Sequence, residues 1–129
     1  MLCEAFVDVE ERQLAGCTAY TAARDALAAV HDASVAWPLQ LARDARRAAA
    51  HAVAVTAEGL AHRHGSAAQR RCVRAALEHA IALASSLDIA VAATGRTAAH
   101  DIAMAVAQHR ASKAIALLGL LLHANFVNV

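Results

Sequence analysis

Residues 64–97, HGSAAQRRCVRAALEHAIALASSLDIAVAATGRT, decide the fold class because they hold one uninterrupted helical segment between two breaks. Ser66 followed by Gln69 is typical of a capping box, in which the hydroxyl accepts a backbone N–H and the amide reaches back. Gly95 suits a left-handed C-cap, and Thr97 suits the N-cap of the next helix. Alanine, the best helix former, dominates the segment between them. The stretch therefore predicts a long helix, a short connection and the start of another helix.

Toward the N-terminus, the single proline of the chain marks a further break at Trp37-Pro38. Proline fits the first turn of a helix because its missing N–H costs nothing there, so one helix should end before Trp37 and another begin near Pro38. Short connections between four helices place neighbours antiparallel. We therefore predict an all-α protein, an up-and-down four-helix bundle formed by a single domain over residues 1–129. Its expected core includes Leu27, Val53, Leu77, Ile81, Ile102 and Val106.

The composition and charge exclude several classes of protein. The chain is 59% hydrophobic, so it is not disordered, but much of that fraction is alanine, which buries little area and suggests help from a partner subunit. The formal net charge of +1 excludes a strongly basic chain wholly devoted to DNA. Residues 1–16 contain acids and no apolar run, unlike a secretory signal, so we expect a cytoplasmic protein.

Three cysteines and eight histidines raise the question of a metal site. Cys3, Cys17 and Cys72 are an odd number at wide spacing, which is typical of free thiols in a reducing compartment. Glu58 and His62 share a helix face, but di-iron bundles require Glu-x-x-His on two helices, and no glutamate here has that spacing. We therefore expect no metal and no cofactor.

The last predicted helix is apolar on every side over residues 114–122, AIALLGLLL. A helix with one solvated side keeps a polar stripe, so a second surface should cover this one, most economically in a homo-oligomer. The apolar run stops at His123, short of the ~20 residues that a membrane span needs. One side is expected to hold Ile115, Leu118 and Leu122, the other Leu117, Leu120 and Leu121. All six are candidates for the subunit interface.

Residues 46–59, RRAAAHAVAVTAEG, resemble the Arg-Arg-Ala-Ala…Ala-Glu-Gly signature of the four-helix-bundle proteins encoded in 23S ribosomal RNA intervening sequences. The resemblance implies a left-handed up-and-down bundle that assembles into a ring-like homopentamer without established enzymatic chemistry. A related branch, the accessory proteins of diversity-generating retroelements, binds nucleic acid and a reverse transcriptase. The residues that match the motif are Arg46, Arg47, Glu58 and Gly59.

Within the motif, two residues carry structural expectations. A glutamate late in a helix lies near the negative end of the helix dipole, so Glu58 should pair with an arginine of a neighbouring helix or subunit. Gly59 should let another backbone pass close by, because it has no Cβ. The alternative is that Glu58 lines a pocket.

Positive charge is concentrated in residues 40–75, which hold two acids and seven bases. Arginines on both sides of the second break can contact phosphates by charge and bidentate geometry. Alternatively they pair with Glu10 and Glu11 at the start of the first helix. The first cluster consists of Arg63, Arg70, Arg71 and Arg74. A second, at the opposite end of the same predicted helix, consists of Arg43, Arg46 and Arg47.

No pattern of nucleophilic catalysis is present. Ser85 and Ser86 fall in mid-helix without a paired His and Asp pattern, and the chain has no Gly-x-Ser-x-Gly or phosphate-binding loop. We therefore predict a non-enzymatic homopentameric assembly or interaction module without a membrane partner. The alternative is a nucleic-acid-binding accessory factor that uses the arginine clusters, with nucleic acid or a nucleic-acid enzyme as its partner.

Overall fold

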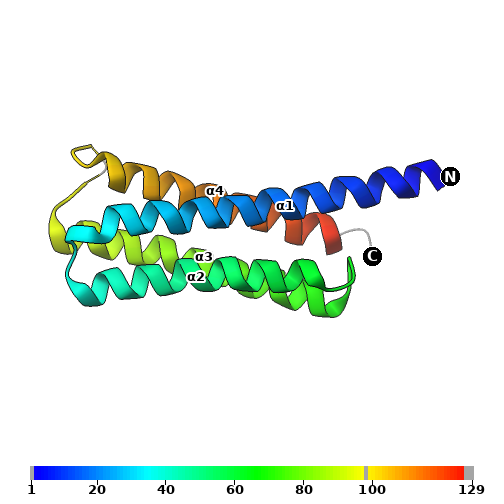
Figure 1. The fold of residues 1–129 in the computed structure, drawn as a ribbon, viewed down its shortest axis with the longest axis horizontal. Helices are drawn as coiled ribbons and strands as arrows, with labels where there is room; N and C mark the ends of the chain where they lie inside the picture. The colour runs from blue at the N-terminus through cyan, green and yellow to red at the C-terminus, as the bar shows by residue number, and fades with distance from the viewer. Residues whose placement is uncertain (1, 98, 127–129) are drawn as a thin grey trace.

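A computed structural model of the chain describes residues 2–97 and 99–126, and the burial of side chains between 15 and 123 apart from 98. The helices are α1 (Leu2–Ala33), α2 (Leu39–Ala61), α3 (Ala67–Thr94) and α4 (Ile102–Phe126), with a short 3-10 helix, η1 (Ser34–Ala36), after α1. Neighbouring helices run antiparallel, with the α1–α2 and α3–α4 connections at one end and the α2–α3 connection at the other (Figure 1). The predicted all-α, up-and-down four-helix bundle is confirmed.

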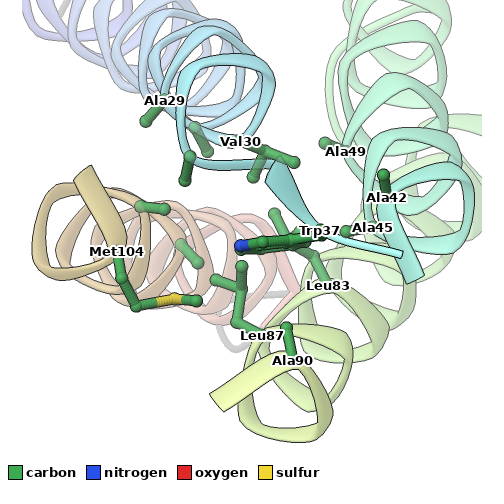
Figure 2. Close-up of a cluster of buried hydrophobic side chains, with 14 residues drawn as sticks. Ala29, Val30, Trp37, Ala42, Ala45, Ala49, Leu83, Leu87, Ala90 and Met104 are labelled. Atoms are coloured by element: carbon green, nitrogen blue, oxygen red, sulfur yellow. The ribbon is translucent and has the colours of Figure 1, made fainter. Parts of the chain in front are cut away.

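Each helix packs against two others: α1 and α3 both contact α2 and α4. Alanine fills most of the buried positions, so the larger apolar side chains are concentrated in two clusters. The tryptophan cluster lies toward the α1–α2 connection and includes Val30, Trp37, Leu83, Leu87 and Met104, with the indole in its midst (Figure 2). The leucine cluster, farther along the bundle, consists of Ala19, Val73, Ala76, Ala80, Leu118 and Leu121.

The predicted core was only partly right. Leu27 and Leu77 are partly buried against the two clusters, and Val53 is half-buried. The prediction was wrong for Ile81, Ile102 and Val106, which are 49%, 84% and 41% exposed, respectively. Other residues, chiefly alanines and leucines, occupy the inward positions of α3 and α4, and these three side chains lie on the outer face.

The two predicted helix boundaries around α3 are confirmed. The backbone N–H of Gln69 donates to Ser66 Oγ over 3.2 Å, and Gly65 N–H donates to Gln69 Oε1 over 2.9 Å. The two bonds resemble a capping box, except that the Gln69 side chain binds the residue before the N-cap and not the N-cap itself. Gly95 has φ 69° and its N–H donates to the Val91 carbonyl over 2.9 Å. That backbone conformation is one that glycine adopts without steric cost.

The N-terminus of α4 differs from the prediction. Asp101, and not Thr97, caps the helix: Met104 N–H donates to Asp101 Oδ1 over 3.1 Å, and α4 begins at Ile102. The Thr97 carbonyl instead accepts the N–H groups of His100 and Asp101, which forms a turn before the helix. A carboxylate caps the N-terminus and also interacts favourably with the positive end of the helix dipole, which is why the aspartate takes this position.

Among the described residues, α3 is a helix whose length and composition would allow it to cross a membrane. In the bundle it packs against α2 and α4, and its buried side consists of alanine, valine and leucine together with Gln69. The bundle buries 28% of this apolar stretch, and the expectation of no membrane partner stays a prediction.

Candidate functional site

Polar and ionisable groups gather at the α2–α3 connection. Helix α2 ends at Ala61, and the extended residue His62 follows as its C-cap, with its N–H donating to the Gly59 carbonyl over 3.2 Å. The Gln69 side chain is buried, and its Nε2 donates to the same carbonyl over 3.3 Å. Gln69 therefore links the end of α2 to the first turn of α3 and holds the connection in one arrangement.

Close packing of α2 against α3 depends on Gly59. A Cβ atom placed on Gly59 would lie 2.9 Å from the Cβ of Cys72, a distance that real side chains do not tolerate without movement. The predicted close approach at Gly59 is therefore present, and the element that approaches is the second turn of α3. The glycine lets Glu58, its neighbour in sequence, lie close to Cys72.

Three groups with metal-ligating atoms lie together at this point. A carboxylate oxygen of Glu58, a ring nitrogen of His62 and the Sγ of Cys72 all lie within 4.8 Å of one another. Glu58 and His62 are exposed, whereas Cys72 is partly buried. We call these three residues the Glu-His-Cys cluster.

The environment of Cys72 disfavours its thiolate. Burial raises the pKa of the Cys72 thiol, the negative charge of Glu58 raises it further, and the positive charge of Arg71 lowers it by a smaller amount. Without an added cation, the thiol therefore stays protonated and weakly nucleophilic at neutral pH.

The predicted ion pair of Glu58 with an arginine of a neighbouring helix is wrong for the described residues. There the recorded ion pair joins Arg110 to Asp25, with 4.0 Å between nitrogen and oxygen. An arginine of another subunit stays a prediction. Glu58 instead faces the Cys72 thiol.

Cys72 was not predicted as a site residue. Glu58 and His62 were placed on one helix face, whereas the cysteines were interpreted separately, by their spacing along the chain. A usable signal was present, because Glu58 and Cys72 each lie seven residues from Gly65, the left-handed residue of the connection. Residues equally far from the turn of an antiparallel helix pair lie at the same level.

The arginines of the first cluster are all exposed at this end of the bundle: Arg63, Arg70, Arg71 and Arg74. In the second cluster, Arg43 and Arg47 are exposed at the opposite end of α2, whereas Arg46 is partly buried and its Nε donates to Ser34 Oγ over 2.8 Å. Arg46 therefore holds η1 against α2. The side chains of Glu10 and Glu11, the alternative partners of the first cluster, lie outside the described residues.

The six leucine and isoleucine candidates on α4 do not share one environment. Leu118 and Leu121 are both buried in the leucine cluster of their own chain, so the prediction that they pack on different sides of the helix was wrong. Leu121 follows Leu118 by three residues and therefore lies on the same helix face. Leu120 is 64% exposed. The remaining three are partly buried against the leucine cluster: Ile115, Leu117 and Leu122.

Exposed apolar side chains are nevertheless abundant on α3 and α4. We use the name α3–α4 surface for the outer faces of these two helices, which expose five large hydrophobic side chains, none of them in the lining of the groove described next: Ile81, Ile89, Ile102, Val106 and Leu120. A groove of 260 Å³ between the helices is lined by Ala84 and Asp88 of α3 and by Gln108 and Ser112 of α4, among others. No atom lies within 4 Å of a Cβ built on Gly119, farther along α4, so there is open space beside this helix.

Comparison with known proteins yields no assignment, since no family model, no curated protein and no solved structure matches the chain. The likeness of residues 46–59 to the intervening-sequence proteins therefore stays a resemblance, and function has to be argued from the geometry described above.

Proposed function

We propose that the chain is a non-enzymatic assembly module that associates with copies of itself through the α3–α4 surface. The observation that carries this proposal is the exposure of the five large apolar side chains that define the surface, between 41% and 84% each. Apolar area left in water costs about 25 cal/mol per Å², so covering it by a second copy is favourable. The resemblance to the intervening-sequence proteins supports a ring-like homopentamer as the oligomeric state.

The α4 residues that were predicted for the subunit interface have two different roles in this proposal. Leu118 and Leu121 stabilise the bundle of the subunit itself, because they lie in its leucine cluster. Leu120 contacts the neighbouring copy, together with Ile81 of α3. The interface is therefore built from both helices and not from α4 alone.

The test is the absolute mass of the native particle by light scattering during size exclusion. We expect about five times 13.4 kDa for the wild type and 13.4 kDa for the double variant Ile81→Glu, Leu120→Glu. The matched control is Val35→Glu, which replaces a side chain that is 78% exposed but lies outside the α3–α4 surface. Circular dichroism should show unchanged helix content in all three proteins. A monomeric wild type, or a double variant of unchanged mass, would exclude the proposal.

Nucleic-acid binding is the second candidate, favoured by the exposure of the first arginine cluster at the α2–α3 end. Phosphate contacts by arginine supply salt-dependent affinity, and a ring of subunits would multiply them. We expect Arg71→Glu, Arg74→Glu to weaken binding in a fluorescence-anisotropy titration at low salt, whereas Arg96→Glu, at the opposite end of the bundle, has little effect. An absence of binding at low salt excludes this candidate, because electrostatic attraction is strongest there.

A further inference from the structure

We propose that Glu58, His62 and Cys72 bind one zinc ion, which clamps the end of α2 to the second turn of α3. The carboxylate oxygen, the ring nitrogen and the sulfur already lie within 4.8 Å of one another. The three ligands come from two helices and the residue that ends one of them, so the ion would bridge elements that are separate in the sequence.

The types of donor atom in the Glu-His-Cys cluster favour zinc over Mg²⁺ and Ca²⁺. Zinc takes thiolate, imidazole and carboxylate ligands at about 2.0–2.3 Å in a tetrahedral arrangement, which places neighbouring donor atoms about 3.4–3.7 Å apart. The spacing of up to 4.8 Å therefore has to shorten by roughly 1 Å. Glu58 and His62 are exposed and free to rotate toward Cys72, whereas Mg²⁺ and Ca²⁺ prefer oxygen ligands alone.

The scaffold beneath the three ligands is rigid. Gly59 holds the two helices in close contact at the level of Cys72, and buried Gln69 connects the Gly59 carbonyl to the first turn of α3. Only the outer two ligands need to move, so binding orders few groups and costs little conformational entropy.

Charge also favours a cation at this position. The Glu58 carboxylate lies in the last turn of α2, near the negative end of the helix dipole, and makes no ion pair with a described residue. It faces a thiol whose ionisation its own charge opposes. A divalent ion attracts both groups, and on binding the Cys72 thiol releases its proton to solvent as the sulfur–zinc bond forms. Arg71 is exposed, so water and salt screen its repulsion.

Three protein ligands leave the fourth position of the tetrahedron to water. The cluster lies at the outer edge of the connection, with two of its three ligands exposed, so water can reach the ion. This arrangement stabilises the α2–α3 pair, and it is independent of whether the chain assembles through the α3–α4 surface.

The experiment titrates the full chain, first stripped with a chelator, with Co²⁺ as a spectroscopic substitute and with Zn²⁺ by calorimetry. We expect one ion per chain and a near-ultraviolet absorption from charge transfer between thiolate and cobalt. Cys72→Ser should abolish this absorption, whereas Cys17→Ser, a change at an exposed cysteine on α1, should retain it. Glu58→Gln and His62→Gln should each weaken zinc affinity by roughly tenfold or more, because even indirect partners of a metal have effects of that size.

The chain has eight histidines, so weak binding elsewhere on its surface must be distinguished from this site. Zinc should raise the melting midpoint of the wild type and of Cys17→Ser but leave that of Cys72→Ser unchanged, since a ligand stabilises only the fold that binds it. A wild type without the thiolate–cobalt absorption, or Cys72→Ser with the wild-type absorption and midpoint shift, would overturn the proposal. Serine nearly matches cysteine in size, and circular dichroism confirms that the variants fold.

Discussion

The two ends of the bundle are closed by different physical means. At the α1–α2 connection, Trp37 is 6% exposed and fills the space between the helices with an apolar ring (Figure 2). At the α2–α3 connection, Ser66 and Gln69 close the end with hydrogen bonds, and the Glu-His-Cys cluster lies beside them. Packing at the α1–α2 connection stabilises the bundle without presenting polar groups, whereas the polar groups at the α2–α3 connection include some that can bind a ligand.

The largest effect is expected where packing alone closes the bundle. Trp37→Ala should lower the free energy of unfolding by about 3–5 kcal/mol, because it leaves a cavity among the side chains of the tryptophan cluster. Chemical denaturation monitored by circular dichroism measures the change, since the variant has lost the single tryptophan of the chain as a fluorescent probe.

Trp37→Phe tests how much of the aromatic ring the packing at this end requires. The buried indole N–H of Trp37 has no hydrogen-bond partner among the described residues. Phenylalanine keeps most of the apolar ring and removes that donor, so the loss should be less than about 1.5 kcal/mol. A loss as large as that of the alanine variant would mean that a single six-membered ring does not fill the space and that this end needs the whole indole.

An intermediate effect is expected at the polar end. Gln69→Leu should lower the free energy of unfolding by about 1–3 kcal/mol, because it removes hydrogen bonds with the Gly59 carbonyl and the Gly65 N–H. The matched control is Gln40→Leu, in which an exposed amide loses its bond to Asp44 and stability should change by about 0.5 kcal/mol or less. Equal losses in the two variants would show that the burial of Gln69 does not contribute to stability, and that the buried polar groups do not close this end of the bundle.

The smallest effect concerns the second connection at the tryptophan end. Asp101→Ala should cost about 1 kcal/mol, because Met104 N–H loses its side-chain acceptor and the helix dipole loses a favourable charge. Thr97→Ala should leave the melting midpoint nearly unchanged, since its carbonyl and not its hydroxyl makes the turn bonds. If the threonine variant were the less stable of the two, the assignment of the cap to Asp101 would be wrong.

Helix boundaries were predictable where the residue that marks the boundary interacts with residues within about one helical turn. Pro38 before α2, the Ser66–Gln69 pair and Gly95 were all interpreted correctly, because each acts through bonds to residues at most four positions away. Thr97 was misinterpreted because two residues with capping side chains stand close together before α4. Local propensity alone did not separate Thr97 from Asp101, four positions farther along.

Burial was predicted less well, for a related reason. Ile81, Ile102 and Val106 were expected inside because they are large and apolar, yet all three are exposed. Leu121 was expected on a different side of the helix from Leu118, yet both are buried in the leucine cluster. Which side of an apolar, alanine-rich helix faces inward depends on how closely its neighbours approach, and a pattern with little polar contrast does not specify that rotation.

By itself the sequence determined the helical class, the number of helices, the positions of most of their ends and the antiparallel order that short connections impose. These properties follow from interactions within one or two helical turns. The approach of Cys72 to Glu58 and His62, the bond between Arg46 and Ser34, and the outward position of five large apolar side chains of α3 and α4 arise only from tertiary packing. Those arrangements depend on the rotation and separation of whole helices, which the close contact at Gly59 and the buried alanines set together.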